Sequence, residues 1–276
     1  MNKQELVFLL NKYAIKPQRS KGQNFLLDQR VITKIIQAAE LTKESLVVEI
    51  GPGVGVLTSA LCEQAAHVIA VEVDQRMITI LEKLTSVNPG LKIVRQDILS
   101  INYADLTAVR PYTLVGNLPY NITSAIFKHA LESEHQPERM VVMVQKEVGE
   151  RIMAKPGEMS LLALSVQLYG TPSFVTMVSR TSFHPQPDVT SMVIQIDQIH
   201  HPKDVHIKTL FKLAHMGFGG KRKQLHNTLA GGLRLSPDDT KRLMNQAKVD
   251  PTIRPQELSV QNWKDLANTV DHFQES

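Results

Sequence analysis

The chain has 276 residues, of which 42% are hydrophobic and 21% charged, and its formal net charge at pH 7 is +4. This length is too great for a small disulfide-stapled scaffold, and the composition excludes disordered and fibrous proteins. The longest apolar runs, such as 140–144, are far shorter than the ~20 residues of a membrane span, and the first residues lack an apolar signal core, so we expect a cytoplasmic protein without a membrane partner.

Basic residues gather in two parts of a nearly balanced chain. Residues 1–22 carry five lysines or arginines against one acidic residue, and residues 201–225 carry six against one. Such clusters favour a polyanionic partner, nucleic acid before membrane, although two solvated faces would have the same composition.

Short apolar runs alternate with amphipathic stretches between residues 45 and 196. The runs predict strands at 46–50, 67–73, 91–94, 112–115 and 140–144, each almost entirely apolar, as strands covered on both faces are. Helical periodicity lies between or just after them, at 31–39, 56–64, 75–84, 124–132 and 159–169. This order predicts a doubly wound α/β core, and two further runs at 174–178 and 189–196 predict an antiparallel end to the sheet.

After residue 196 the apolar residues recur only at helical spacing. Four helices are predicted, at 206–216, 223–230, 239–247 and 262–270, and Ser236 followed by Pro237 marks the start of the third. We therefore predict an α/β domain over residues 1–200 and a small all-helical domain over residues 201–276.

Cysteine and histidine usage argues against metal and redox chemistry. Cys62 is the single cysteine, which excludes an internal disulfide, and the ten histidines show no zinc spacing. We interpret His200, His201 and His206 as linker histidines and expect no metal ion. Nothing in the sequence requires an oligomer, so we expect a monomer.

Glycines and acidic residues follow the predicted strands. The first strand runs into Gly51-Pro52-Gly53-Val54-Gly55, where the backbone can approach a ligand, although Val56 stands where a dinucleotide fingerprint has glycine. Glu72 lies 21 residues after Gly51, the spacing at which an acid binds ribose hydroxyls. Asp97, after the third strand, can accept a hydrogen bond from an adenine amino group. Together they favour an adenosine-containing ligand over the alternative of ordinary strand-end and loop acids.

The fourth strand is followed by Asn117-Leu118-Pro119-Tyr120. Acceptors at Asn117 and at the backbone carbonyl of Leu118 or Pro119 would bind both N–H groups of an exocyclic amine and leave its lone pair free, while Tyr120 would stack on the ring. The segment predicts a site for an amino group on a flat base. Taken alone, it is also compatible with a simple turn.

Together these motifs resemble those of the adenine dimethyltransferases of ribosomal RNA, specifically the bacterial small-subunit family linked to kasugamycin sensitivity. The resemblance covers nearly the whole chain and rests also on Gly22-Gln23-Asn24-Phe25-Leu26, Gln145-Lys146-Glu147-Val148 and Phe183-His184-Pro185-Gln186-Pro187-Asp188-Val189. It implies a Rossmann-like class I S-adenosylmethionine-dependent methyltransferase core with a small C-terminal all-helical domain. It also implies dimethylation of the N6 amine of two adjacent adenosines in a 3′-terminal hairpin loop of small-subunit (16S) ribosomal RNA, with a role in ribosome biogenesis.

The family's sites carry over onto matching positions of this chain. The resemblance implies that the basic segment 1–30 contributes to the S-adenosylmethionine site, and that S-adenosylhomocysteine is the product. The cofactor-binding residues would be Gln23, Asn24, Leu26, Gly51, Gly53, Glu72, Asp97 and Asn117. A flipped adenine would meet Asn117, Leu118, Pro119 and Tyr120, with Phe183 as a second stacking face unless its ring packs in the core. Contacts to RNA of the small ribosomal subunit are expected at Arg19, Lys21, Lys146, Arg151, Lys221, Arg222 and Lys223.

Two positions depart from the family's pattern. Lys221 stands where arginine is common, which keeps the charge but loses the planar fork that binds phosphate bidentately. Met159-Ser160 precedes the Leu-rich segment where relatives often carry Tyr-Gly, which affects how that helix packs.

Three other functions compete with this one. A large-subunit adenine methyltransferase of the macrolide-resistance type is disfavoured by Gly22-Gln23 in place of Ser-Gln, by Leu118 in place of isoleucine and by the Phe218–Lys223 motif. A non-catalytic assembly or transcription factor on the same fold would not need Asn117-Leu118-Pro119-Tyr120 with Glu72 and Asp97. A nicotinamide-dependent dehydrogenase is disfavoured by Val56 and by the basic clusters.

Overall fold

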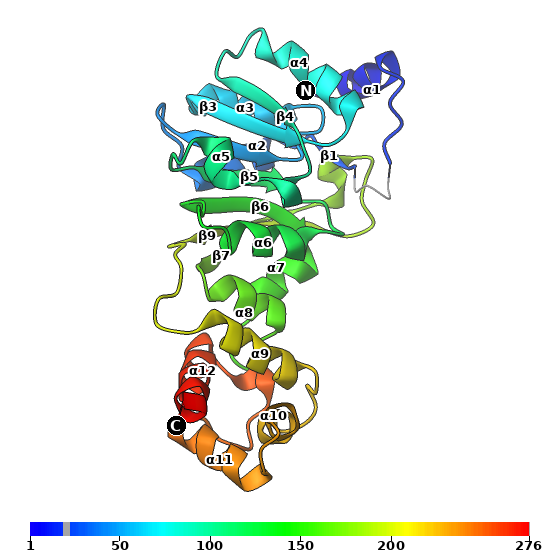
Figure 1. Ribbon diagram of the computed structural model, residues 1–276. Helices are drawn as coiled ribbons and strands as arrows, with labels where there is room; N and C mark the ends of the chain where they lie inside the picture. Colours follow the sequence, from blue (N-terminus) through cyan, green and yellow to red (C-terminus); the bar gives the residue numbers. More distant parts are fainter. Residues whose placement is uncertain (19–22, 276) are drawn as a thin grey trace. The chain divides into compact units, whose positions relative to one another are not determined.

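The computed structural model describes residues 1–18 and 23–275, and it divides into two compact units (Figure 1). The first unit comprises Met1–Gly149 with Gly170–Ile199, and the second comprises Glu150–Tyr169 with His200–Ser276. These units differ from the expected domains 1–200 and 201–276 in one segment, 150–169, which groups with the helical unit. The reason is local: the N–H groups of Gly157 and Met159 both donate to the Gln256 carbonyl, at 2.9 and 3.0 Å.

A seven-stranded sheet lies at the centre of the first unit, in the order β4-β3-β2-β5-β6-β9-β7. The first five strands in the chain pair in parallel, and β9 pairs antiparallel with both β6 and β7, as the sequence predicted. The strand order reverses between β2 and β5, and open α/β sheets bind their ligands at such a switch point. The strands are β2 Leu46–Ile50, β3 His67–Glu72, β4 Leu91–Arg95, β5 Thr113–Asn117, β6 Arg139–Gln145, β7 Thr171–Val178 and β9 Ser191–Asp197.

Helices cover this sheet because its central strands are apolar on both faces. All five residues of β2 are buried, and the buried side chains of α2 and α3 pack against β2, β5 and β6 in one core cluster. The strand at 46–50 and the helix at 56–64 coincide with their predicted ranges residue for residue. The helices of this unit are α1 Lys3–Lys12, α2 Gln29–Ala39, α3 Val56–Gln64, α4 Gln75–Thr85, α5 Tyr103–Thr107 and α6 Thr123–Leu131, and α7 Lys146–Ile152 begins in it.

The N-terminal segment is more structured than expected. Helix α1 starts at a capping box in which Asn2 and Glu5 exchange hydrogen bonds, and Leu6 and Leu10 are buried. After it, β1 (Phe25–Leu26) pairs antiparallel with β8 (Phe183–His184) to form a separate two-stranded sheet. The sequence analysis missed both elements and the short helices α5 and α7.

The second unit is helical, as expected after residue 200. Its core contains Trp263, fully buried, whose ring centroid lies 5.6 Å from that of Phe218. Ser236 caps one helix as predicted, since its Oγ accepts the Asp239 N–H at 3.1 Å. Ser160 caps another by accepting the Ala163 N–H at 3.1 Å, so that helix begins two residues later than its predicted start at 159. The helices here are α8 Leu161–Gln167, α9 Ile207–Phe218, α10 Leu225–Leu233, α11 Pro237–Gln246 and α12 Val260–Glu275. Among the described helices of both units, none is long and apolar enough to cross a membrane.

Candidate active site

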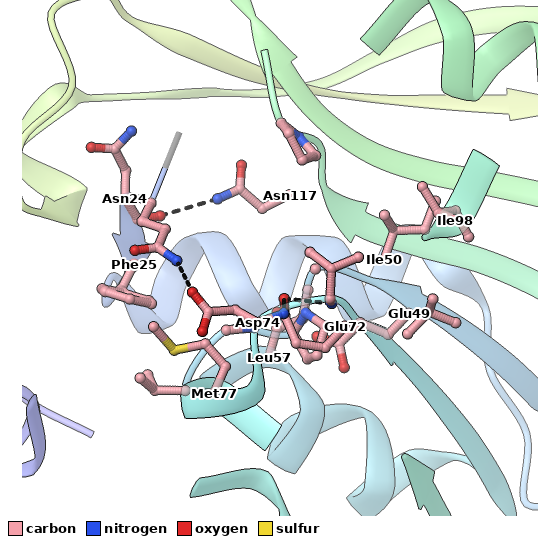
Figure 2. Close-up of a pocket in the computed structure, with 18 of the residues that line it drawn as sticks. Asn24, Phe25, Glu49, Ile50, Leu57, Glu72, Asp74, Met77, Ile98 and Asn117 are labelled. Carbon is pink, nitrogen blue, oxygen red and sulfur yellow. Dashed lines mark hydrogen bonds between the residues drawn. The ribbon is translucent and has the colours of Figure 1, made fainter. Parts of the chain in front are cut away.

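A cavity of about 250 Å³ lies at the carboxyl ends of β2, β3, β4 and β5 (Figure 2). Its walls are the glycine-containing loop after β2, the acids that follow β3 and β4, and the segment after β5. The N-terminal residues Gln23–Leu26 complete it. The sequence-predicted residues found in its lining are Gln23, Asn24, Leu26, Gly51, Gly53, Glu72, Asp97, Asn117 and Pro119.

Gly53 lets an N-terminal residue close one side of this cavity. Its backbone has φ +56°, and a Cβ atom there would lie 3.0 Å from the ring of Phe25. Glycine therefore serves both the left-handed backbone and the close approach of that ring.

The lining carries four carboxyl groups, those of Glu49, Glu72, Asp74 and Asp97, and among its described residues no lysine, arginine or histidine. A dinucleotide would place a pyrophosphate here without a cation to meet it. The cavity instead favours a ligand that carries positive charge, which counts against the dehydrogenase alternative. Across residues 1–18 and 23–275, no group of three or more His, Cys, Asp or Glu side chains could hold a metal ion.

Glu72 is held in place by the backbone that follows it. Its Oε1 accepts the N–H groups of Val73 at 2.8 Å and Asp74 at 2.9 Å, while Oε2 accepts only a long bond from the Gly53 N–H at 3.4 Å. Burial raises the pKa of this carboxyl, and the backbone N–H groups oppose that rise. Oε2 thus retains capacity to accept a hydrogen bond from a ligand hydroxyl.

The other two predicted acids also do structural work. Asp74 caps α4 by accepting the Arg76 N–H at 3.1 Å, and the Arg76 side chain holds the pKa of this carboxyl far below its usual range. Asp97 is exposed and accepts the Leu99 N–H at 3.0 Å, so it caps a short 3₁₀ turn at the rim of the cavity.

Glu49 is a lining residue that the sequence analysis missed. It sits within the apolar strand β2, is 1% exposed, and its Oε2 has no hydrogen-bond partner within the described structure. Burial raises the pKa of this carboxyl to about 8, helped by the nearby charge of Glu72 and opposed by the Thr58 hydroxyl. An acid inside an otherwise apolar strand was the signal that could have revealed it.

Replacing Glu49 by glutamine is expected to stabilise the protein at alkaline pH more than at acidic pH. Because the folded-state pKa is raised, the folded protein binds a proton that the unfolded chain has released, so wild-type stability falls as pH rises from about 4.5 towards about 8. The difference in melting temperature between Glu49→Gln and wild type should therefore grow over this range and then level off. Melting curves from pH 5 to 9, with the exposed Glu44→Gln as control, test this; a difference that is constant with pH would contradict it.

The segment after β5 presents hydrogen-bond acceptors. The Asn117 Nδ2 donates to the Asn24 carbonyl at 3.2 Å, so the side-chain oxygen Oδ1 is the end left to accept (Figure 2). The Pro119 carbonyl already accepts from the Ile122 N–H at 3.2 Å and from the Thr123 hydroxyl at 3.0 Å. Of the two backbone carbonyls considered, that of Leu118 is thus the better second acceptor.

The two predicted stacking rings have different environments. The Tyr120 hydroxyl lies 2.8 Å from the Ser191 Oγ, burial raises its pKa, and its ring is partly exposed. Phe183 is 3% exposed and packs in the core cluster with Leu26 and Val193, outside the cavity lining. Phe183 therefore occupies the core position given as its alternative, and stacking on a base would require its ring to leave the core.

The residues expected to contact RNA lie outside this cavity. Lys146 and Arg151 are exposed on α7, and Lys221, Arg222 and Lys223 are exposed between α9 and α10. Arg19 and Lys21 lie outside the described residues.

Comparisons with known proteins agree with this geometry. Residues 15–272 match the family model described as ribosomal RNA adenine dimethylase. Proteins named ribosomal RNA small subunit methyltransferase A are 42% identical in Dehalococcoides mccartyi, over 94% of this chain and 90% of theirs, and 36% identical in Clostridium botulinum, over 98% of both. Among solved structures, the 23S rRNA methyltransferase ErmE is 27% identical with a TM-score of 0.73, covering 90% of this chain and all of that one. A dimethyladenosine transferase from Plasmodium falciparum is 24% identical with a TM-score of 0.76, covering 90% and 98%.

Proposed function

The chain belongs to the ribosomal RNA adenine dimethylase family, and from that premise we propose that it transfers methyl groups from S-adenosylmethionine to the N6 amine of adenosines in small-subunit ribosomal RNA. The observation that carries the proposal is the meeting of an acid-lined cavity with the free acceptor end of Asn117 in its wall. We assign the modification to two adjacent adenosines of a 3′-terminal hairpin loop. The protein would then act in the cytoplasm, on small ribosomal subunits.

The chemistry of the cavity supports S-adenosylmethionine as the methyl donor. This compound carries a positive sulfonium and an ammonium group, supplies a methyl group already activated for transfer, and contains a ribose. Four carboxyl groups without a basic side chain among the described lining residues match those charges, and the Glu72 Oε2 can accept from a ribose hydroxyl. We propose Gln23, Asn24, Leu26, Gly51, Gly53 and Asp97 as further binding residues.

The segment after β5 would prepare the target amine. The N6 nitrogen is a poor nucleophile because its lone pair is delocalised into the ring. Acceptors at the Asn117 Oδ1 and the Leu118 carbonyl would bind its two N–H groups and free the lone pair for attack on the methyl carbon, after which one proton leaves. Pro119 keeps the segment extended, and Tyr120, tied to Ser191, would stack on the base.

The choice of the small subunit rests on the relatives rather than on the fold. The curated relatives that match 94–98% of this chain carry small-subunit names, whereas a 23S methyltransferase has the same fold. The large-subunit activity therefore stays the alternative to be tested.

One assay separates these functions. Purified protein and S-adenosylmethionine are incubated with unmethylated small subunits and, separately, with large subunits, and the digested RNA is analysed by mass spectrometry. Dimethyladenosine in a 3′-terminal fragment of small-subunit RNA is the expected result. Product only in large subunits would support the resistance-type enzyme, and tight binding without product would support a non-catalytic assembly factor.

Reversing the charge of Lys221, Arg222 and Lys223 together to glutamate is expected to weaken particle binding about tenfold, since each lost phosphate contact lowers the salt dependence of affinity by about one. Cofactor affinity should not change. Binding measured at several salt concentrations tests this, with Lys241→Glu/Arg242→Glu on α11 as a matched control. Wild-type affinity at every salt concentration would remove these residues from the interface.

A further inference from the structure

Residues 23–27, here called the strap, contact several segments that build the cavity. The Gln23 Nε2 donates to the Asp74 Oδ2 at 3.0 Å, next to the end of β3 (Figure 2). Phe25 and Leu26 pair with β8, and the Leu27 N–H donates to the Ser182 carbonyl at 2.9 Å. The strap is thus fixed from two sides of the first unit.

The strap also determines how the Asn117 side chain is turned. An amide has a donor end and an acceptor end of nearly the same shape, and packing alone does not distinguish them. Here the donor end meets the Asn24 carbonyl at 3.2 Å, which leaves Oδ1 as the acceptor. An amide turned end for end would set its own N–H groups against those of a target amine, and no hydrogen bond could form.

Helix α1 holds the strap through apolar packing. Leu6 and Leu10, which are 0% and 4% exposed, form one core cluster with Phe25 of the strap and with Met77 of α4. Phe25 and Met77 also line the cavity. The cluster therefore connects a helix remote from the reacting atoms to the residue next to Asn24.

We propose that the strap is a positioning element for methyl transfer, in which the Asn24 carbonyl selects the reactive orientation of the Asn117 amide and α1 keeps that carbonyl in place. The inference rests on the function proposed above and adds to it a role for α1. It concerns the rate of transfer rather than the binding of either substrate.

The first test replaces Asn117 by aspartate, which keeps an acceptor but removes the N–H donor. The ionised side chain sets a second oxygen against the Asn24 carbonyl and should be nearly inactive at pH 8, whereas the protonated side chain can donate to that carbonyl. The ratio of kcat for Asn117→Asp to wild type should therefore rise as pH falls from 8 to 5.5, by up to about tenfold per pH unit. Using the ratio cancels titration of the four lining carboxyl groups, and Asn117→Ala should show no rise.

The second test compares two residues of α1. Leu6→Ala should lower kcat about tenfold with cofactor and particles both saturating, because the strap is displaced by a fraction of an ångström. Phe8→Ala, on the same helix but 69% exposed in wild type, should keep the wild-type kcat. Melting curves verify folding, and the milder Leu10→Val replaces Leu6→Ala if that variant does not fold.

The outcomes are distinct. A ratio for Asn117→Asp that is constant with pH, or wild-type activity of this variant at pH 8, overturns the role of the Asn24 carbonyl. A Leu6→Ala variant that changes only the KM for the cofactor overturns the role of α1. Absence of methylated adenosine with the wild-type protein would overturn the proposed function itself.

Discussion

Replacing Asn117 by alanine is expected to lower kcat by about 100-fold to 1000-fold, the usual loss when a group that stabilises developing charge is removed. The Oδ1 atom would accept a hydrogen bond from the target amine, and this bond strengthens as the nitrogen becomes positive during attack. The affinity for S-adenosylmethionine should fall by no more than about threefold, because the carboxyl groups of the cavity remain.

Asn121→Ala is the matched control, since this exposed asparagine lies four residues further along the same segment. Equilibrium binding of the cofactor and single-turnover methylation of small subunits separate the two effects. A loss of cofactor affinity as large as the loss of rate would refute this division of roles.

Gly116→Ala is expected to destabilise the protein by about 1–3 kcal/mol, the usual range for overpacking a close-packed interior. Gly116 lies in β5 between β2 and β6, and a Cβ atom there would stand 2.6 Å from the Ile50 carbonyl oxygen and 3.1 Å from the Ile50 Cβ. Since β2 is hydrogen-bonded on both sides, its backbone cannot easily move away. Because the next residue is Asn117, the variant should also lose activity.

The control for this variant is Gly231→Ala. Gly231 lies within α10, where a Cβ atom would meet nothing within 4 Å, so alanine should stabilise that helix by up to about 1 kcal/mol. Denaturant unfolding followed by circular dichroism compares the two variants. Equal stability of Gly116→Ala and wild type would show that the strands can separate locally.

The main architecture could be predicted because it follows from periodicity. Apolar runs of five residues in strands buried on both faces, followed by amphipathic helices, give the parallel order, and the glycine loop and Glu72 then fall at the carboxyl ends of neighbouring strands. The cap at Ser236 has a local signature and was recognised for that reason.

What was missed depends on contacts between distant residues. Nothing near Phe25 indicates that it will pair with His184, or that the Asn24 carbonyl will orient Asn117. Helix α1 had a local signal in the Asn2–Glu5 capping box, but its continuous apolar run concealed the helical period. Phe183 was expected at the site because of its motif, whereas its environment is the core.

Strand β9 is synthesised after β7 yet lies between β6 and β7 in the sheet. During synthesis the chain must therefore hold β7 away from β6 until residues 191–197 leave the ribosome, and Phe25 must wait as long for its partner in β8. Pairing of such separated segments is slow compared with helix formation. A nascent chain thus remains without a finished cavity until more than two thirds of its residues have been made, and it becomes competent to bind a ligand only near the end of its own translation.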